Sequence, residues 1–264
     1  MRTLDHVVIN TRDRTDAAAE LFTRLGFQVG ARGFHTLGSI NHTIVFGTDY
    51  LELLGYPPGA PPAKRPELVE RPLGLMATVL NAPDADTTRS ELLAAGLKPR
   101  PVQAFSRPVD LPDGSAGIAA FRVTRLEPDA VPGTWFYFCQ QQTPGMVWRP
   151  EWQIHANGAT GIAAIDIELP DVPAALADYA ACTGATPIGS GAGARFDLAG
   201  CALRLSRGQG PARMTGLTFR CASLEPVAAC IAAARLRSER RDRLIRLDPA
   251  ECLGATLQFM VTAR

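Results

Sequence analysis

The stretch TLDHVVINTRDRTDAAAELFTRLG, residues 3–26, decides the fold that we expect for this chain. Residues 3–10 are rich in Val and Ile, a composition typical of a strand. Asp13 can cap the alanine-rich helix that follows, and Gly26 can end that helix because glycine tolerates a positive φ. Further strands are predicted at 27–33, 42–46 and 50–54. The predicted order is therefore β-α-β-β-β.

The same order recurs three times further along the chain. The new copies begin at Gly74, Gly161 and Thr215. In the second and third copies, as in the first, an aspartate opens the helix and a glycine 12 or 13 residues later ends it, whereas the fourth copy lacks this glycine. The later strands are predicted at 75–80, 97–105, 119–126, 134–140, 161–169, 194–199, 201–206, 216–222, 244–248 and 255–261. Such recurrence indicates a fold built from repeats.

A single βαβββ unit leaves one apolar face of its sheet uncovered, so it must pair with a second unit. A Pro-rich connection at 57–66 separates the first two copies, and a longer one at 143–161 separates the second from the third. We therefore predict an α+β chain in which four βαβββ modules pair into two barrels. The first barrel spans 1–145, with modules at 1–56 and 72–142, and the second spans 158–264, with modules at 160–208 and 213–264.

Composition excludes several classes of function. The chain of 264 residues carries 27 basic and 26 acidic side chains, a balance that favours neither nucleic acid nor a membrane surface. No apolar run approaches the ~18 residues of a membrane span. The first residues enter a strand pattern at once and leave no room for a signal peptide, so we expect a cytoplasmic protein whose six scattered cysteines stay reduced.

The segments LDHVVI (4–9), at the start of the first module, and YLELLG (50–55), on its fourth strand, are set in paired βαβββ modules. This arrangement resembles the vicinal oxygen chelate superfamily. The stretch from Asn41 to Gly55 is most similar to its glyoxalase-like domain proteins. The resemblance implies tandem barrels that bind a divalent metal, with ligands from the first and fourth strand of each module.

The resemblance places His6 and Glu52 at the metal-ligand positions, and it implies that one of them also moves a proton as a catalytic residue. Imidazole and carboxylate groups suit Zn, Fe, Mn or Ni. On an alternating strand Glu52 shares a face with Tyr50 and Leu54. A charge between leucines is costly unless it faces a wet cavity, which favours a site here.

The other modules lack matching ligands. Alignment on the helix starts puts Ala77 opposite His6 and either Phe136 or Tyr137 opposite Glu52. The corresponding residues of the second barrel are Ala164, Arg204, Thr218 and Gln258. A catalytic metal normally takes three protein ligands, so either another residue completes the set or the barrel binds its ligand without metal.

Several polar side chains are candidates for contacts with substrate. These are Asn41 and His42 at the third strand, Tyr137 and Gln140 at 134–140, and His155 in the long connection. That connection also carries Trp148 and Trp152, and the alternative is that its aromatic residues join the two barrels. Arg107, Arg122 and Arg149 form either a basic rim or a solvated surface, and His35 is expected in a solvated loop.

Three functional hypotheses follow. The leading one is a metal-assisted enzyme of the lyase, isomerase or dioxygenase type, acting on a small oxygenated molecule in the first barrel. The second is a non-catalytic protein that binds and sequesters a small molecule. The third is a scaffold that acts through protein contacts. The second barrel is expected to be structural or regulatory, and a homodimer is compatible with all three hypotheses.

Overall fold

The computed structural model describes residues 1–111 and 113–261. The first half of the chain forms β1 (Leu4–Arg12), α1 (Thr15–Arg24), β2 (Gly33–Phe34), β3 (Ile40–Val45), β4 (Tyr50–Gly55), α2 (Glu67–Glu70), β5 (Gly74–Asn81), α3 (Ala85–Ala94), β6 (Gln103–Asp110), β7 (Ala116–Arg125) and β8 (Trp135–Gln141). The second half forms β9 (Ala159–Leu169), α4 (Val172–Thr183), β10 (Gly193–Asp197), β11 (Ala202–Arg207), β12 (Arg213–Cys221), α5 (Glu225–Ala234), β13 (Ser238–Arg241), β14 (Leu244–Leu247) and β15 (Thr256–Val261).

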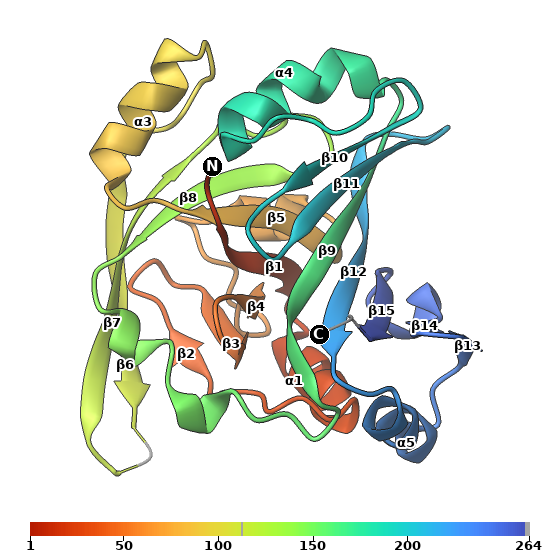
Figure 1. Ribbon diagram of the computed structural model, residues 1–264. Helices are drawn as coiled ribbons and strands as arrows, with labels where there is room; N and C mark the ends of the chain where they lie inside the picture. The colour runs from red at the N-terminus through yellow and green to blue at the C-terminus, as the bar shows by residue number, and fades with distance from the viewer. Residues whose placement is uncertain (112, 262–264) are drawn as a thin grey trace.

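Each half contributes one sheet (Figure 1). The strand orders are β2-β3-β4-β1-β5-β8-β7-β6 and β10-β11-β9-β12-β15-β14-β13. In both sheets two modules meet through their first strands, which pair antiparallel as β1 with β5 and β9 with β12. Each first strand also runs parallel to the last strand of its own module. The predicted α+β fold of modules paired two by two is therefore confirmed. Three modules have the full βαβββ order, whereas the third consists of β9, α4, β10 and β11 and lacks one strand of that order.

Helix caps follow the prediction in two copies and depart from it in one. Asp84 and Asp171 each accept a hydrogen bond from a backbone N–H three residues on, as N-caps do. Asp13 was predicted to do the same, but α1 begins at Thr15 and its cap position falls on Arg14, which makes no side-chain cap. The prediction was wrong because β1 continues further than expected and shifts the start of the helix.

Two strand predictions also need correction. The predicted strand at 27–33 is wrong, because only Gly33 and Phe34 pair there. Phe27 instead turns into the core between the two sheets, 5.0 Å from the Phe219 ring. Strand β13 was not predicted, because all four of its residues are exposed and polar, so it shows no alternation of apolar side chains.

The two sheets differ in how far they close. The first curls until its edges meet, and the Thr36 N–H donates across this gap to the Ser106 carbonyl at 3.2 Å, joining the loop after β2 to β6. The second sheet stays open between its edge strands β10 and β13, for which no such bond occurs in the described part of the chain (Figure 1). Only the first half therefore encloses an interior.

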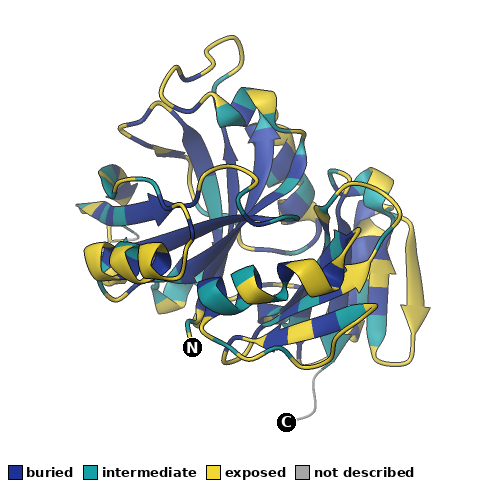
Figure 2. Ribbon diagram, turned by 90° about the horizontal axis from the view of Figure 1, so that it is seen from above, coloured by how far each residue is buried: buried dark blue, intermediate teal, exposed yellow. Residues whose placement is uncertain are grey.

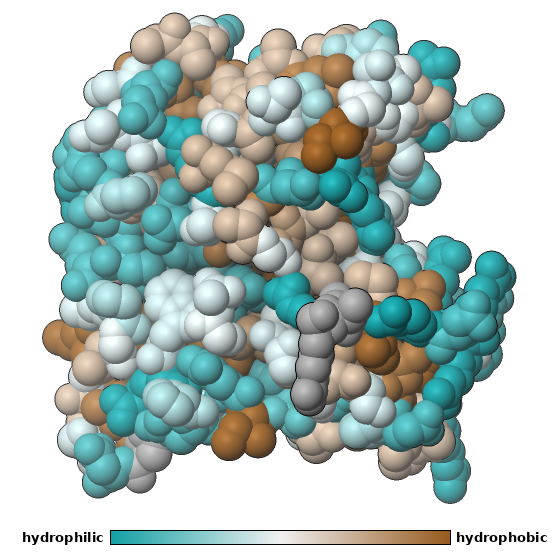
Figure 3. Space-filling model, viewed as in Figure 1, coloured by the Kyte–Doolittle hydropathy of each residue, from teal (hydrophilic) through white to brown (hydrophobic). Residues whose placement is uncertain are grey.

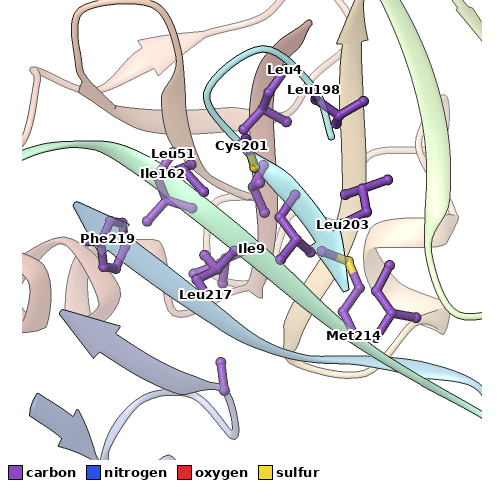
Figure 4. Packing of buried hydrophobic residues seen from close by; sticks show 14 of the residues in the cluster. Leu4, Ile9, Leu51, Ile162, Leu198, Cys201, Leu203, Met214, Leu217 and Phe219 are labelled. Atoms are coloured by element: carbon purple, nitrogen blue, oxygen red, sulfur yellow. The ribbon is translucent and has the colours of Figure 1, made fainter. Parts of the chain in front are cut away.

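Strand alternation divides the apolar residues into two clusters. In β1, Val7 and Ile9 face the second sheet, whereas Val8 faces the interior of the first. Figure 4 shows Ile9 close to Leu217 in the cluster between the sheets, to which both halves of the chain contribute. Figure 2 shows the strands at the centre buried and the exposed residues concentrated on helices and loops. The sheets thus pack back to back on a shared core.

Asp49 adds a polar contact across this interface. It lies in the turn between β3 and β4 and is only 4% exposed. Its Oδ1 accepts a hydrogen bond from the Ile162 N–H of β9 at 3.0 Å. Burial raises the pKa of this carboxyl from 3.8 to about 6, although the Ile162 hydrogen bond and Arg220 oppose the shift. A titratable group is therefore built into the interface between the halves.

The outer surface offers few large apolar features. On the face in Figure 3, hydrophobic side chains occur as small separate patches. Several arginines of the basic segment 235–246 form local ion pairs, such as Arg240 with Glu225 at 2.5 Å and Arg237 with Glu251 at 2.7 Å. No helix in the described residues is long and apolar enough to cross a membrane. All six cysteines are free, and five of them are buried.

Candidate functional site

The interior of the first sheet holds a narrow cavity. Its walls come from β1, β3, β4, β5, β6, β7 and β8, and from the loops that carry His35 and Arg65. The centre of a water molecule can move through about 30 Å³ of it. A ligand of more than a few atoms therefore requires flexible lining side chains to move aside.

His6 and Glu52 meet in this cavity, from the neighbouring parallel strands β1 and β4. The register pairs His6 with Tyr50, and the two rings stack with centroids 4.2 Å apart. His6 Nε2 lies 3.7 Å from Glu52 Oε2. Both side chains are more than nine-tenths buried. The alternation that predicted a cavity-facing Glu52 between two leucines thus matches its observed position.

Asp5 holds the other side of the His6 ring. His6 Nδ1 and Asp5 Oδ1 are 2.5 Å apart, and Gln141 donates a further hydrogen bond to the same carboxylate at 3.1 Å. With the proton placed on Nδ1, the ring donates to Asp5 and directs Nε2 toward Glu52. Asp5, His6 and Glu52 therefore form a continuous chain of acid–base groups in an otherwise apolar strand environment.

Glu52 is held as a carboxylate. Burial raises the pKa of Glu52, but His6, His35, the hydrogen bond from Asn41 and Arg65 together outweigh burial and bring it below its usual value. Asn41 Nδ2 donates to Glu52 Oε1 at 2.6 Å. This bond leaves Oε2 directed toward His6. Asn41, a predicted substrate contact, therefore lies in the cavity and orients the carboxylate.

His35 is a further member of the site that the prediction missed. It was expected to be solvated, yet it is 8% exposed and packs edge-on against Phe105. Its Nδ1 bonds to Ser39 Oγ at 2.9 Å, and its Nε2 lies 3.9 Å from Glu52 Oε1. Burial lowers the pKa of His35 to about 4, with Glu52 opposing the shift. The imidazole is therefore neutral near pH 7.

Three buried arginines line the opposite part of the cavity. Arg65 comes from the loop before α2, Arg107 from β6 and Arg125 from β7, and each is at most 8% exposed. Arg65 Nε donates to Glu67, and an Arg125 terminal nitrogen donates to Gln103 Oε1 at 2.8 Å. The sequence offered one available signal, since the i±2 neighbours of Arg107, Phe105 and Val109, are both apolar.

Tyr137 joins this arginine cluster. The Arg125 guanidinium lies over its ring, 5.0 Å from the centroid. Burial raises the pKa of Tyr137, while Arg65 and Arg125 oppose the shift. Its hydroxyl has no hydrogen-bond partner within the described residues, and the same holds for one terminal nitrogen of Arg65 and for Nε of Arg125. Tyr137, a predicted substrate contact, therefore belongs to the cavity wall.

The structure does not bring the remaining predicted contacts to this cavity. His42 faces the opposite side of β3 from Asn41, and its Nδ1 bonds to the Gly30 carbonyl at 2.7 Å. Gln140 faces outward from β8 and accepts a hydrogen bond from the Ala85 N–H at 3.2 Å. In both cases a neighbour on the strand occupies the inner face, because alternate residues point to opposite sides.

His155 lies at the interface between the halves. Its Nδ1 accepts from the Gln28 N–H at 3.0 Å, and its Nε2 lies 3.1 Å from the Val45 carbonyl. Both ring nitrogens are therefore engaged with backbone groups. His155 attaches the connection between the halves to the first half and does not line the cavity.

The register shows which residues of the second module lie beside the site. His6 pairs with Val79, whereas Ala77 pairs with Val8. Val79 and Tyr137 line the cavity, while Phe136 faces the core between the sheets. Within each module, Glu52 lies two residues beyond the partner of His6 on the parallel strand, and Tyr137 lies two residues beyond the partner of Ala77. The predicted alignment of Ala77 with His6 and of Tyr137 with Glu52 is compatible with this register and stays a prediction. Among the described residues of this second module, none adds an acidic or imidazole group to the cavity wall.

The superfamily resemblance implies a divalent metal, but the residues present do not fit one. No three His, Cys, Asp or Glu side chains within the described residues are arranged to hold an ion. Glu52, His6 and His35 all face the cavity but are not arranged to hold one ion, and the buried guanidinium groups of Arg65, Arg107 and Arg125 would repel a dication. We therefore derive no step through a metal.

In the second sheet the corresponding positions satisfy one another. Arg204 makes two hydrogen bonds to Asp166, at 2.6 and 2.9 Å, and a third to Thr218 at 2.9 Å. Gln258 donates to Asp166 at 3.4 Å, and Ala164 pairs with Thr218. The predicted residues thus cluster, but their polar atoms are used internally. This cluster differs in that respect from the donor set of the first sheet.

Comparison with known proteins gives a family and a fold. Residues 4–183 match the model of a glyoxalase-like domain. A hypothetical protein from Staphylococcus aureus is similar in structure, with a TM-score of 0.75, 11% identity, and coverage of 99% of this chain and 100% of that one. A mutant of 4-hydroxymandelate synthase from Streptomyces coelicolor gives a TM-score of 0.61 and 12% identity, covering 99% and 93%.

A fusion of a xylose isomerase-like TIM barrel with 4-hydroxyphenylpyruvate dioxygenase is also similar, with a TM-score of 0.60 and 11% identity. The match covers 98% of this chain but 48% of the fusion, about half its length. Comparison of the sequence with curated proteins finds no match. At these identities the structural likeness concerns the fold alone.

Proposed function

Because this chain belongs to the glyoxalase-like domain family of the vicinal oxygen chelate superfamily, we propose that its first barrel is an active site for proton transfer on a small oxygenated organic molecule. The reaction is of the isomerase or lyase type. The observation that carries the proposal is the buried chain Asp5–His6–Glu52, whose last two members face the cavity 3.7 Å apart.

Each member of the chain has a distinct part in the proposed reaction. Asp5 accepts a hydrogen bond from Nδ1 of His6 and fixes the ring, which also stacks on Tyr50. Nε2 of His6 and Oε2 of Glu52 then share access to a substrate atom placed beside both. The Glu52 carboxylate removes a proton from carbon, and this same proton returns to carbon or oxygen, either directly from Glu52 or from Nε2 of His6 after Glu52 has passed it there.

The surrounding groups orient the reacting pair. Asn41 holds one oxygen of Glu52, so that the other remains free toward His6. Neutral His35 can donate or accept a hydrogen bond to a substrate oxygen, because its pKa of about 4 keeps it uncharged near pH 7. The narrow cavity excludes bulk water, which strengthens every one of these interactions.

Deuterium exchange tests the proposal. The purified protein is incubated in D₂O with small α-hydroxy and α-oxo carbonyl compounds, both acids and neutral analogues, and loss of the C–H signal is followed by ¹H NMR. We expect exchange in the native protein and a loss of about 100-fold or more in Glu52→Gln and His6→Gln. The matched control is His42→Gln, an imidazole outside the cavity, which should exchange at the native rate.

Two other outcomes of this experiment would contradict the proposed enzymatic function. Equal exchange in the native protein and in both cavity variants would mean that the acid–base chain takes no part. Saturable binding without any exchange would select the second candidate, a non-catalytic binding protein. That alternative is favoured by the unpartnered donors of Arg65, Arg125 and Tyr137, which can hold a ligand without performing chemistry on it.

A further inference from the structure

The arginine side of the cavity carries an excess of positive charge. Arg65, Arg107 and Arg125 reach the same space from three separate elements of the fold. Arg65 is paired with Glu67, and no carboxylate in the described residues lies within 4 Å of the other two. The only carboxylate of the described cavity wall, Glu52, is held by Asn41 and faces His6. Two of the three buried guanidinium groups, those of Arg107 and Arg125, are thus left without a carboxylate partner among the described residues.

Three donor atoms in this part of the cavity are left without partners among the described residues. They are one terminal nitrogen of Arg65, Nε of Arg125 and the hydroxyl of Tyr137. These residues are 5%, 8% and 4% exposed, so bulk water does not satisfy them. Buried donors are normally paired, and exceptions call for an explanation. A ligand that accepts hydrogen bonds and carries a negative charge would pair with these donors and would also supply the arginines with a negatively charged partner.

The geometry of the donors favours a planar acceptor. Arg125 is held flat by the ring of Tyr137 at 5.0 Å and by that of Phe105 at 5.8 Å, and its terminal nitrogen is anchored on Gln103. The edge that carries Nε remains available. A guanidinium edge matches the two oxygens of a carboxylate, and a negative charge there pairs with guanidinium groups that lack a carboxylate partner within the protein.

We propose that the ligand of this cavity is a small carboxylic acid, bound by its carboxylate to Arg65, Arg107, Arg125 and Tyr137, with its neighbouring carbon directed at His6 and Glu52. This inference rests on the proposed function for the identity of the reacting end. The carboxylate side stands on the unpartnered donors and the excess charge.

Paired ligands isolate the carboxylate. Calorimetric titration compares pyruvate and glycolate with pyruvamide and glycolamide, which keep the shape and lose the charge, and adds inorganic phosphate as a dianionic probe. We expect each acid to bind at least 10-fold more tightly than its amide and than phosphate. Equal binding of acid and amide, tighter binding of phosphate, or no binding of either acid at 10 mM would overturn the inference.

Variants test whether the arginines of the cavity cause the preference for acids over amides. Arg125→Gln should weaken binding of the acids at least 10-fold and remove their advantage over the amides. Arg122→Gln is the matched control, because Arg122 lies on the same strand, faces outward and pairs with Asp86. Arg107→Gln serves as a second cavity variant if Arg125→Gln does not fold, which urea unfolding of each variant establishes. Unchanged affinity in a folded cavity variant would count against the site.

The two proposals fail separately. Preferential binding of acids without deuterium exchange leaves the carboxylate site standing and removes the proton transfer. Exchange on neutral analogues with no preference for acids removes the carboxylate site and leaves the proton transfer.

Discussion

Replacing Asp49 by asparagine should raise the free energy of unfolding at neutral pH, and the gain should be smaller at acidic pH. The carboxyl is 4% exposed, and its pKa is raised from 3.8 to about 6, mainly by burial. A raised pKa means that the folded state holds the proton more tightly than the unfolded state. Stability therefore falls as pH rises from about 4 to about 6, and it stays lower above that window.

The magnitude follows from the size of the shift. A shift of about two pK units, at about 1.4 kcal/mol each, costs the folded state up to about 3 kcal/mol once the carboxyl is ionised. The asparagine side chain carries no charge, and its oxygen can still accept the hydrogen bond from the Ile162 N–H. The advantage of Asp49→Asn should grow by about 2 kcal/mol between pH 4.5 and pH 7.5.

Urea unfolding of the native protein and of Asp49→Asn, across this pH range, measures the difference directly. Every other titrating group is common to both proteins, so its contribution cancels. A stability difference that stays constant with pH, or a variant that is less stable than the native protein at pH 7.5, would show that the interface does not desolvate the carboxyl.

Three further predictions concern the interface between the halves. Phe219→Ala removes a fully buried ring that contacts aromatic residues of both halves; it should cost about 3–5 kcal/mol in urea unfolding, and a loss below about 1.5 kcal/mol would contradict the shared core. Gly26→Ala places a Cβ 2.5 Å from Cys230 Sγ at a φ of +82°. The control is Gly96→Ala, at a φ of +81° with no atom within 4 Å of the added Cβ, which should lower the stability by about 1–2 kcal/mol. In thermal unfolding, Gly26→Ala should lower the stability by more than this control. His155→Phe loses two hydrogen bonds to backbone groups and should lower the free energy of unfolding by about 1–3 kcal/mol. Its ligand affinity, measured by calorimetry, should stay within twofold of the native value, and a larger change would show that His155 contributes to the binding site.

Local chemistry explains the parts of the fold that could be predicted. Asp84 and Asp171 cap their helices through bonds that span three residues, and strand alternation depends on neighbours two residues apart. These signals lie within a few positions of one another, so the sequence displays them directly. They suffice for the order of elements and for the inward direction of His6 and Glu52.

The rest of the site depends on contacts between distant segments. Arg65 lies in the Pro-rich connection at 57–66, which carries no periodic pattern, and it enters the cavity only because that connection folds back over the first sheet. His35 is buried by Phe105, which comes from β6, 70 residues away in the sequence. No local pattern reports such closure, so both residues were missed.

The shared core between the sheets has a consequence for synthesis of the chain on the ribosome. The first sheet is complete once Gln141 has emerged, yet much of its outer face is covered by the segment from Ala159 to Val261. At about 5–20 residues per second, that apolar face stays open for roughly 6–24 seconds. We expect nascent chains stalled when residues 1–158 have left the ribosome to be digested by protease far faster than the released protein, and equal resistance would show that the first half protects itself.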